Sequence, residues 1–189
     1  VEEYGRTYYV DENGNKAIGS KEINGAWNYF DKHGELITNN FAPDGRYYDK
    51  YGKQVDFGTN RYFELNGEWY YAGNDGAILK GPQTIDGVKV YFHQNGIQAK
   101  GYFVKDEEDN KSRYYDKDTG ALATNQYVIA YNPYKHRIER YYVNDQGIRL
   151  TGPQTIDGKQ VYFDTYEGSQ VFDNFGDDGY FYDQDGNRV

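Results

Sequence analysis

Residues 81–101 read GPQTIDGVKVYFHQNGIQAKG, and the first seven of them return unchanged at 152–158. Both copies continue into a Val-Tyr-Phe run, at 90–92 and at 161–163, and a more distant copy begins at Gly19. Self-similarity of this kind is the sequence signature of a repeat architecture. The chain is therefore expected to fold as an array of similar units.

A smaller unit recurs inside these copies. It consists of two aromatic residues, three or four polar residues, a glycine and a short mixed strand, and its nine instances begin at Tyr8, Tyr29, Tyr47, Tyr70, Tyr91, Tyr114, Tyr141, Tyr162 and Phe181. Tyrosine and phenylalanine suit a pleated strand. Pairs such as Asn24-Gly25 and Asp86-Gly87 supply the positive φ angles that tight hairpin turns need. Each unit is therefore predicted to form one β-hairpin.

The predicted fold class is all-β, with the nine hairpins stacked as a β-solenoid. A lone two-stranded hairpin is marginal in water, whereas tandem hairpins can share an aromatic core with their neighbours. No stretch shows helical periodicity of useful length. We expect a single array over 1–189 with sub-modules of about 1–80, 81–151 and 152–189. Because the chain opens in mid-pattern, it is expected to be a fragment of a longer protein.

Composition restricts the class of ligand. The 189 residues include 23 Tyr, 10 Phe and 2 Trp, so rings must supply most of the buried surface. A disordered chain would be poor in such residues. The net charge is −9, which disfavours nucleic acid, a ligand that needs a basic face, and anionic membranes. No apolar run approaches the ~18 residues of a membrane span. A neutral ligand fits this charge.

The sequence predicts neither catalysis nor a cofactor. There is no Cys, which excludes disulfides and thiolate chemistry. A glycosidase needs two carboxylates set across one sugar bond, whereas the acidic residues here recur beside turn glycines, where Asp favours local hydrogen bonds. Examples are Asp11, Asp31, Asp49, Asp116 and Asp183. The three histidines lie far apart, and no spacing typical of metal ligands emerges.

The run 81–101 closely resembles the glucan-binding repeats that flank the catalytic core of glucansucrases from lactic acid bacteria, and strong or weak copies cover essentially the whole chain. The resemblance implies a secreted or cell-surface β-solenoid that binds dextran-like α-glucans and accompanies catalytic domains elsewhere in a parent chain. Choline-binding modules and clostridial toxin repeats belong to the same superfamily. Choline cages usually carry Trp, and only Trp27 and Trp69 are present here. A structural or adhesive solenoid remains the alternative.

Strand alternation predicts a sugar site in the unit at Tyr91. If residues 93–96 form the turn, Phe92 pairs with Ile97 and Tyr91 pairs with Gln98. Because alternate residues share a face, one face then carries Val90, Phe92, Ile97 and Ala99, and the outer face carries Lys89, Tyr91, Gln98 and Lys100.

That outer set has the chemistry of a hexose site, because a ring offers a platform, Gln donates and accepts, and Lys donates. The resemblance implies the same Tyr, Gln and Lys pocket. The second strong copy keeps Tyr162 and Gln170 but has Phe172 where Lys100 stood. The two stretches that interrupt the period, 106–111 and 132–137, are expected to be surface loops without function.

Overall fold

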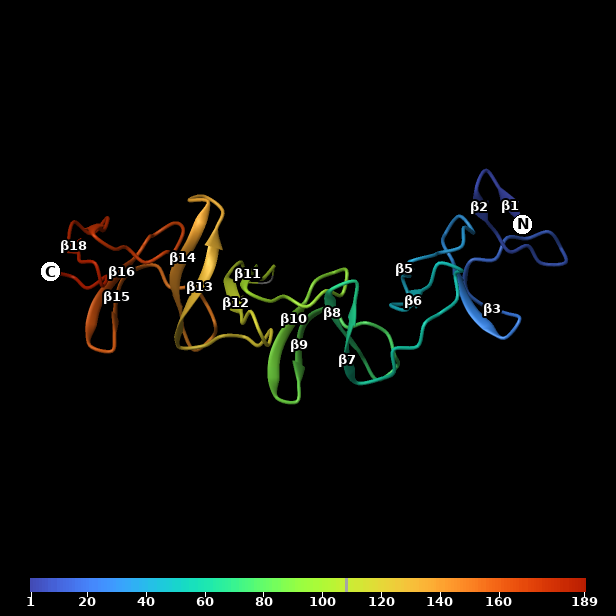
Figure 1. Cartoon of the computed structure of the whole chain (residues 1–189), viewed down its shortest axis with the longest axis horizontal. Helices are drawn as coiled ribbons and strands as arrows, with labels where there is room; N and C mark the ends of the chain where they lie inside the picture. The colour runs from blue at the N-terminus through green and yellow to red at the C-terminus, as the bar shows by residue number, and fades with distance from the viewer. Residues whose placement is uncertain (108) are drawn as a thin grey trace. The chain divides into compact units, whose positions relative to one another are not determined.

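The protein folds as nine antiparallel two-stranded hairpins, as predicted, and no helix occurs in the described residues, 1–107 and 109–189, of this computed structural model (Figure 1). The strands are β1 (Glu2–Glu3), β2 (Arg6–Thr7), β3 (Gly19–Ile23), β4 (Ala26–Phe30), β5 (Asn40–Phe41), β6 (Tyr47–Tyr48), β7 (Arg61–Leu65), β8 (Glu68–Ala72), β9 (Gly81–Ile85), β10 (Val88–Phe92), β11 (Tyr102–Lys105), β12 (Ser112–Tyr115), β13 (Gln126–Asn132), β14 (Arg137–Val143), β15 (Gly152–Ile156), β16 (Lys159–Phe163), β17 (Asn174–Phe175) and β18 (Phe181–Tyr182). Glu108, within the predicted charged loop 106–111, lies outside the described residues.

The chain divides into two compact units. The first comprises Val1–Gly81 and Phe92–Gln98, and the second comprises Pro82–Tyr91 and Ala99–Val189. Each unit has its own clusters of buried rings and aliphatic side chains. Phe63, Tyr70, Ala72 and Ile78 form one in the first unit, and the second unit contains a larger one around Tyr141. Among the described residues, no helix is long and apolar enough to cross a membrane.

Five hairpins close through a two-residue turn in which both residues have positive φ. Asp86 and Gly87, with φ of 50° and 80°, link β9 to β10. The same geometry occurs at Tyr4-Gly5, Asn24-Gly25, Asn66-Gly67 and Asp157-Gly158. This is the turn whose twist matches that of the paired strands. The Asx-Gly signal in the sequence therefore marks four of these turns correctly.

A second kind of turn follows the aromatic pair of each repeat. In the first unit, the Asp31 carboxylate accepts hydrogen bonds from the backbone amides of His33 and Glu35 at 2.8 and 2.9 Å. These bonds hold the pKa of Asp31 below its ordinary value. Asp11, Asp49, Asp116 and Asp183 accept amide bonds in the same way. The prediction that these carboxylates stabilise turns is confirmed.

The predicted pairing after the Tyr91 unit is wrong by one residue. Phe92 bridges Gln98, not Ile97. The reason is that the His93 amide donates to the Ile97 carbonyl at 2.8 Å, so Ile97 closes the turn and does not begin the next strand. Asn95 supports this five-residue turn by accepting the Ile97 amide through its side chain at 3.1 Å. Gln98 consequently lies on the same side as Phe92 and is buried.

Eight backbone hydrogen bonds join successive hairpins within the units, and we call them ladder bonds. In each, the residue that bridges the last residue of the hairpin's second strand donates its amide to a carbonyl of the preceding hairpin, at 2.8 to 3.2 Å. The donor and acceptor pairs are Leu36–Thr7, Gln54–Trp27, Ile78–Gly45, Gln98–Trp69, Leu122–Lys89, Arg149–Ser112, Gln170–Arg140 and Arg188–Gln160. A ladder bond thus fixes where the outer side chains of one hairpin meet the next hairpin.

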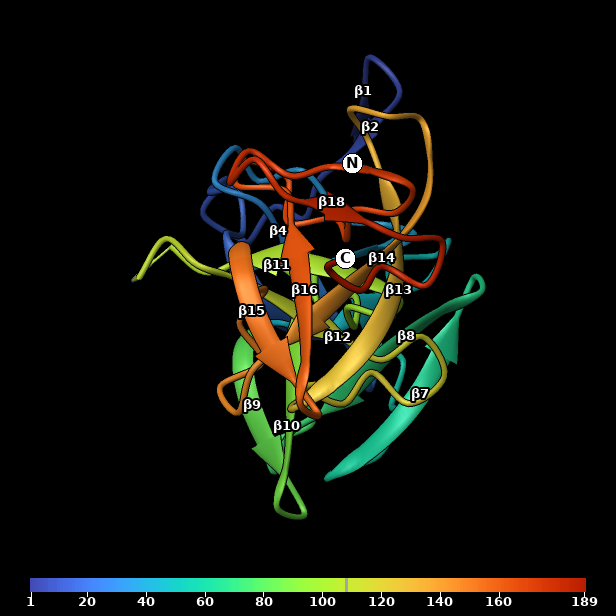
Figure 2. The ribbon, with the colours of Figure 1, turned by 90° about the vertical axis from the view of Figure 1, so that its left-hand side faces the viewer.

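The hairpin β13–β14 departs from the common length. Its strands have seven residues each, and in both views it lies beside the shorter hairpin β15–β16 (Figure 1 and Figure 2). Alternation along β13 buries Val128 and Ala130 and leaves Ile129 and Tyr131 exposed. The extra length projects the tip, residues 132–137, which the sequence marks as an interruption of the period.

Candidate binding site

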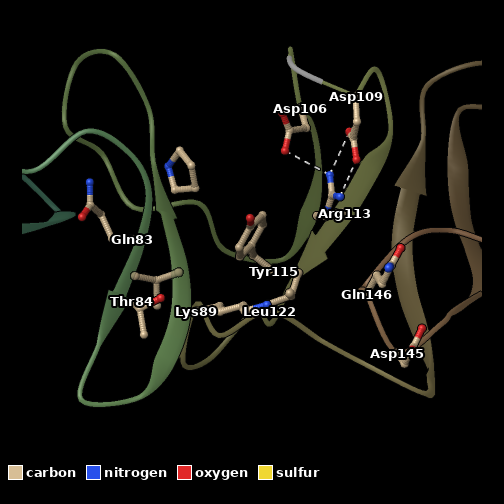
Figure 3. Close-up of a pocket in the computed structure, with 12 residues that line it drawn as sticks. Gln83, Thr84, Lys89, Asp106, Asp109, Arg113, Tyr115, Leu122, Asp145 and Gln146 are labelled. Atoms are coloured by element: carbon tan, nitrogen blue, oxygen red, sulfur yellow. Dashed lines mark hydrogen bonds and ion pairs between the residues drawn. The ribbon is translucent and has the colours of Figure 1, made fainter.

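A hollow of about 580 Å³ lies between the β9–β10 hairpin and β12 (Figure 3). Leu122 and Lys89, which share a ladder bond, both line it. Its walls are Pro82, Gln83, Thr84, Lys89, Val90, Asp106, Asp109, Arg113, Tyr115, Leu122, Asp145 and Gln146, all of the second unit. The Tyr115 side chain lies between the β9–β10 wall and the Arg113 wall, with Gln146 on the far side (Figure 3). We name this space the β9–β10 hollow.

Ion pairs order one wall of this hollow. Arg113 Nη1 donates to Asp106 and Asp109, each at 3.0 Å, and Nη2 donates to Asp109 at 2.5 Å. The guanidinium holds the pKa of Asp109 at about 2, and the Asp109 carboxylate raises the pKa of Arg113. Burial raises the pKa of the Tyr115 phenol, so this group is a neutral hydrogen-bonding group at physiological pH.

The same construction occurs on the other two hairpins that carry the long repeat. The β3–β4 hollow, about 540 Å³, lies in the first unit and contains the ladder pair Trp27 and Gln54. The β15–β16 hollow, about 200 Å³, contains the ladder pair Gln160 and Arg188. Trp27, Lys89 and Gln160 are equivalent residues of the three copies of the repeat. Each hollow is thus built at the corresponding position of its hairpin.

The three hollows share three kinds of side chain: a ring, a carboxamide and a cationic group. In the β3–β4 hollow these are Trp27, Gln54 and Arg46. In the β9–β10 hollow they are Tyr115, Gln83 and Gln146, and Lys89 and Arg113. In the β15–β16 hollow they are Tyr182, Gln154 and Gln160, and Arg188. The Trp27 ring, 49% exposed, can bind an apolar face, whereas the Tyr115 and Tyr182 rings are buried. The amides and cations provide donors and acceptors for hydroxyl groups.

Three of the predicted site residues, all in the second compact unit, lie in different surroundings. Lys89 is exposed and lines the β9–β10 hollow. Tyr91 is partly buried and packs against the cluster of Ala99, Val104 and Tyr115, with its ring 5.8 Å from that of Tyr115. Lys100 Nζ donates to the Asp118 carbonyl at 3.2 Å. Lys89 is therefore the one predicted residue that lines this hollow.

The other three predicted residues lie in the interior. Gln98 is 5% exposed, Tyr162 is 2% exposed and Gln170 is 3% exposed. The outward orientation expected for Gln98 is wrong because of the register described above. Gln170 accepts a hydrogen bond from Arg140 Nε at 2.7 Å, and Tyr162 packs against Tyr182 with a ring separation of 5.5 Å. Gln98 and Gln170 also donate ladder bonds.

Several residues that line the hollows were missed because they belong to the repeat that marks the fold. Gln83 and Gln154 stand at the same place in the two identical seven-residue runs, and Trp27 stands at the position of Lys89. A comparison of equivalent positions across the three copies is the signal that could have found them. Arg113 and Gln146 come from neighbouring turns and strands, and no sequence pattern links them to β9. No group of three or more potential metal ligands occurs within residues 1–107 and 109–189.

Comparison with known families supports a repeat module. The family described as choline-binding repeat matches residues 79–127. Glucosyltransferase-S of Streptococcus mutans is 37% identical over 172 residues, which is 88% of this chain and 11% of the relative. Glucosyltransferase-I of Streptococcus downei is 34% identical over 166 residues, 85% of this chain and 10% of the relative. The chain therefore spans about a tenth of the length of these relatives.

Solved structures agree with the hairpin fold. Choline binding protein F of Streptococcus pneumoniae, solved in the presence of a peptidoglycan analogue, is 27% identical with a TM-score of 0.55, over 97% of this chain and 61% of that chain. The choline-binding domain of CbpL from the same organism is 24% identical with a TM-score of 0.55, over 92% of this chain and 87% of that chain. The predicted resemblance to glucansucrase repeats is confirmed by these comparisons.

Proposed function

On the premise that residues 79–127 match the choline-binding repeat family and that the chain is 37% identical to part of a streptococcal glucosyltransferase, we propose that it is a non-catalytic module that binds α-glucan of the dextran type. The observation that carries the proposal is the threefold recurrence of a hollow with a ring, a carboxamide and a cation at equivalent hairpin positions. Polymer binding uses such recurrence, because several weak sites on one chain raise avidity through effective concentration.

The ligand is neutral because charges within the two larger hollows oppose one another. In the β9–β10 hollow, Lys89 and Arg113 are matched by Asp106, Asp109 and Asp145. In the β3–β4 hollow, Arg46 lies near Asp56 and Asp75 and donates to the Asp75 carbonyl at 2.9 Å. A glucan presents hydroxyl groups that both donate and accept, which suits such mixed walls.

Choline is the second candidate ligand, since the matched family carries its name. A quaternary ammonium binds to the faces of several rings. The β9–β10 hollow, within the matched residues, instead combines a single ring, that of Tyr115, with the cations Lys89 and Arg113. A single ring cannot enclose a quaternary ammonium, so this hollow suits a neutral sugar better.

The architecture suits an extended glucan. We propose that the ladder bonds continue the hairpins as a β-solenoid, in which successive hollows bind one polymer. The relatives are glucosyltransferases, so the proposed partners are the polymer and the catalytic domains of a parent chain, and the proposed location is outside the cell or at its surface. Of the sugar-binding residues predicted from the sequence, Lys89 is proposed to contact the glucan directly. The others are proposed to hold the walls of the hollows in place: Tyr91, Gln98, Lys100, Tyr162 and Gln170.

Affinity electrophoresis in gels with and without dextran tests the proposal. We expect dextran to retard the wild type, Trp27→Ala to weaken retention about tenfold, which is ~1.4 kcal/mol, and the combined variant Trp27→Ala, Lys89→Met, Gln160→Ala to weaken it further. Trp69→Ala is the matched control, because Trp69 accepts the equivalent ladder bond but does not line the β3–β4 hollow. A wild type that migrates equally in both gels would instead support the rival reading as a structural spacer.

A further inference from the structure

A fourth hollow, of about 320 Å³, lies at the tip of the long hairpin β13–β14 and differs from the other three. Most of its wall is aromatic, and it comprises Tyr102, Phe103, Tyr131, Asn132, Pro133, Tyr134, Tyr141, Arg149 and Glu167. Its volume falls at the lower end of the ~300–1,000 Å³ typical of small-ligand pockets. We name it the aromatic hollow.

We propose that the aromatic hollow is a second type of saccharide site, which takes one neutral pyranose ring against Tyr131 and Tyr134 and binds its hydroxyl groups through Arg149 and Glu167. The inference rests on the proposed function for the class of ligand, but it uses none of the residues of the three repeated hollows.

The aromatic surface is available to a ligand. Tyr102 is 41% exposed, Tyr131 is 56% exposed and Tyr134 is 64% exposed. Aromatic side chains carry a large apolar area and lose little conformational entropy on binding. Three such rings around one small hollow provide a platform for the apolar face of a sugar.

The hollow is preorganised by contacts between two irregular segments of the chain. Asn132, which is 1% exposed, donates to Glu167 Oε2 at 2.9 Å, and its own oxygen accepts the backbone amides of Tyr134 and Lys135. Lys135 Nζ donates to Ser169 Oγ at 2.8 Å. Because these bonds fix both the tip and the Glu167 carboxylate, little ordering remains to oppose binding.

The charges of the hollow select a neutral ligand. Arg149 places a guanidinium in the wall and lies over the Phe103 ring, with Cζ 5.6 Å from the centroid. Glu167 places a carboxylate there, which is also paired with Lys135 at 3.2 Å. The Arg149 guanidinium would repel a quaternary ammonium, and the Glu167 carboxylate would repel an anion. Vicinal hydroxyl groups can accept a hydrogen bond from Arg149 and donate one to Glu167.

Calorimetry with isomaltotriose tests this site in the combined variant Trp27→Ala, Lys89→Met, Gln160→Ala, whose aromatic hollow is intact. We expect residual binding in that background, which the further change Tyr131→Ala weakens about tenfold. Glu167→Gln, which keeps the side-chain size, should also weaken it. The matched control is Ile129→Ala, since Ile129 lies two residues before Tyr131 on β13, is 62% exposed and does not line the hollow.

The outcomes separate the two proposals. If the wild type binds isomaltotriose but the combined variant does not, the aromatic hollow is no saccharide site and the proposed function stands. Residual binding that survives both Tyr131→Ala and Glu167→Gln would also overturn the inference, as would heat of binding for choline chloride in place of the sugar. A wild type that binds no isomaltotriose contradicts both proposals.

Discussion

Lys135 Nζ lies 3.2 Å from Glu167 Oε2, and the pair joins two of the places where the chain departs from its repeat. Lys135 belongs to the long tip after β13, and Glu167 belongs to the turn that is one residue longer than its counterpart after Phe92. The ion pair therefore links the longer turn to the longer tip.

Removal of this contact should loosen the tip. Lys135→Met leaves the Glu167 carboxylate without its ion pair and Ser169 Oγ without its donor. We expect a loss of about 1–3 kcal/mol, the usual range for a partly buried charged hydrogen bond, and faster amide hydrogen exchange at Tyr134 and Lys135. Lys117→Met is the control, because both side chains of the Lys117–Asp118 pair are exposed, at 70% and 72%, and exposed pairs contribute little. Equal exchange rates in the two variants would contradict this account of the tip.

A pair of glycine substitutions tests the close packing of successive hairpins. Gly96 and Gly87 have similar φ angles, 84° and 80°, so alanine is strained at both. A Cβ at Gly96 would collide with the Ile78 side chain, whereas a Cβ at Gly87 would meet nothing within 4 Å. We expect Gly96→Ala to lower the free energy of unfolding by ~1–3 kcal/mol more than Gly87→Ala, the range typical of overpacking. Urea unfolding measures the difference, and equal losses would mean that the turn after β10 is not packed against Ile78.

Alkaline pH should destabilise the protein through buried phenols. Burial raises the pKa of Tyr48 from 10.0 to about 12, and its hydroxyl donates to the Asp44 carboxylate at 2.8 Å. A folded-state pKa above the unfolded value means that the stabilisation is complete below pH 10 and is lost as pH rises through about 12. A tyrosinate absorbance titration should therefore contain a late component that Tyr48→Phe reduces. An unchanged titration curve in that variant would contradict the assignment.

Only strong acid should break the ion pair between Arg113 and Asp109, which orders one wall of the β9–β10 hollow. The Arg113 guanidinium lowers the pKa of Asp109 from 3.8 to about 2. Because the folded-state value is the lower one, the contribution is present above pH 3.8 and is lost as pH falls through about 2. An NMR titration of the Asp109 carboxyl should give a midpoint near 2, and Arg113→Met should return it toward 3.8. A wild-type midpoint already near 3.8 would show that the pair does not form in solution.

The sequence predicted the hairpins well because their signals are local. Asp86-Gly87 and its equivalents fix two-residue turns through their own φ preferences, and the nine aromatic pairs correspond to the nine hairpins. The pairing after Phe92 was missed because a hydrogen bond between His93 and Ile97 lengthens the turn. The shift by one residue pairs Gln98 with Phe92, which is why Gln98 lies inside.

The kinds of side chain predicted for the site recur in a hollow, mostly on other residues. A ring, a carboxamide and a cation do meet at one place, but they are Tyr115, Gln83 and Lys89 in the β9–β10 hollow. Tyr115 comes from the next hairpin, and the ladder bond between Leu122 and Lys89 decides which of its side chains face β9. Contacts of that kind depend on how hairpins stack, and no residue-by-residue alternation within one hairpin contains that information.

The most direct test of the central claim is an NMR titration of the wild type with isomaltotriose, followed in the side-chain N–H signals of Trp27 and Gln160 and the backbone amide of Lys89. If the equivalent hollows bind the sugar, these three signals shift together and saturate, whereas the Trp69 indole signal stays in place. Saturable shifts that spare all three signals, or no shifts at all, would contradict the claim.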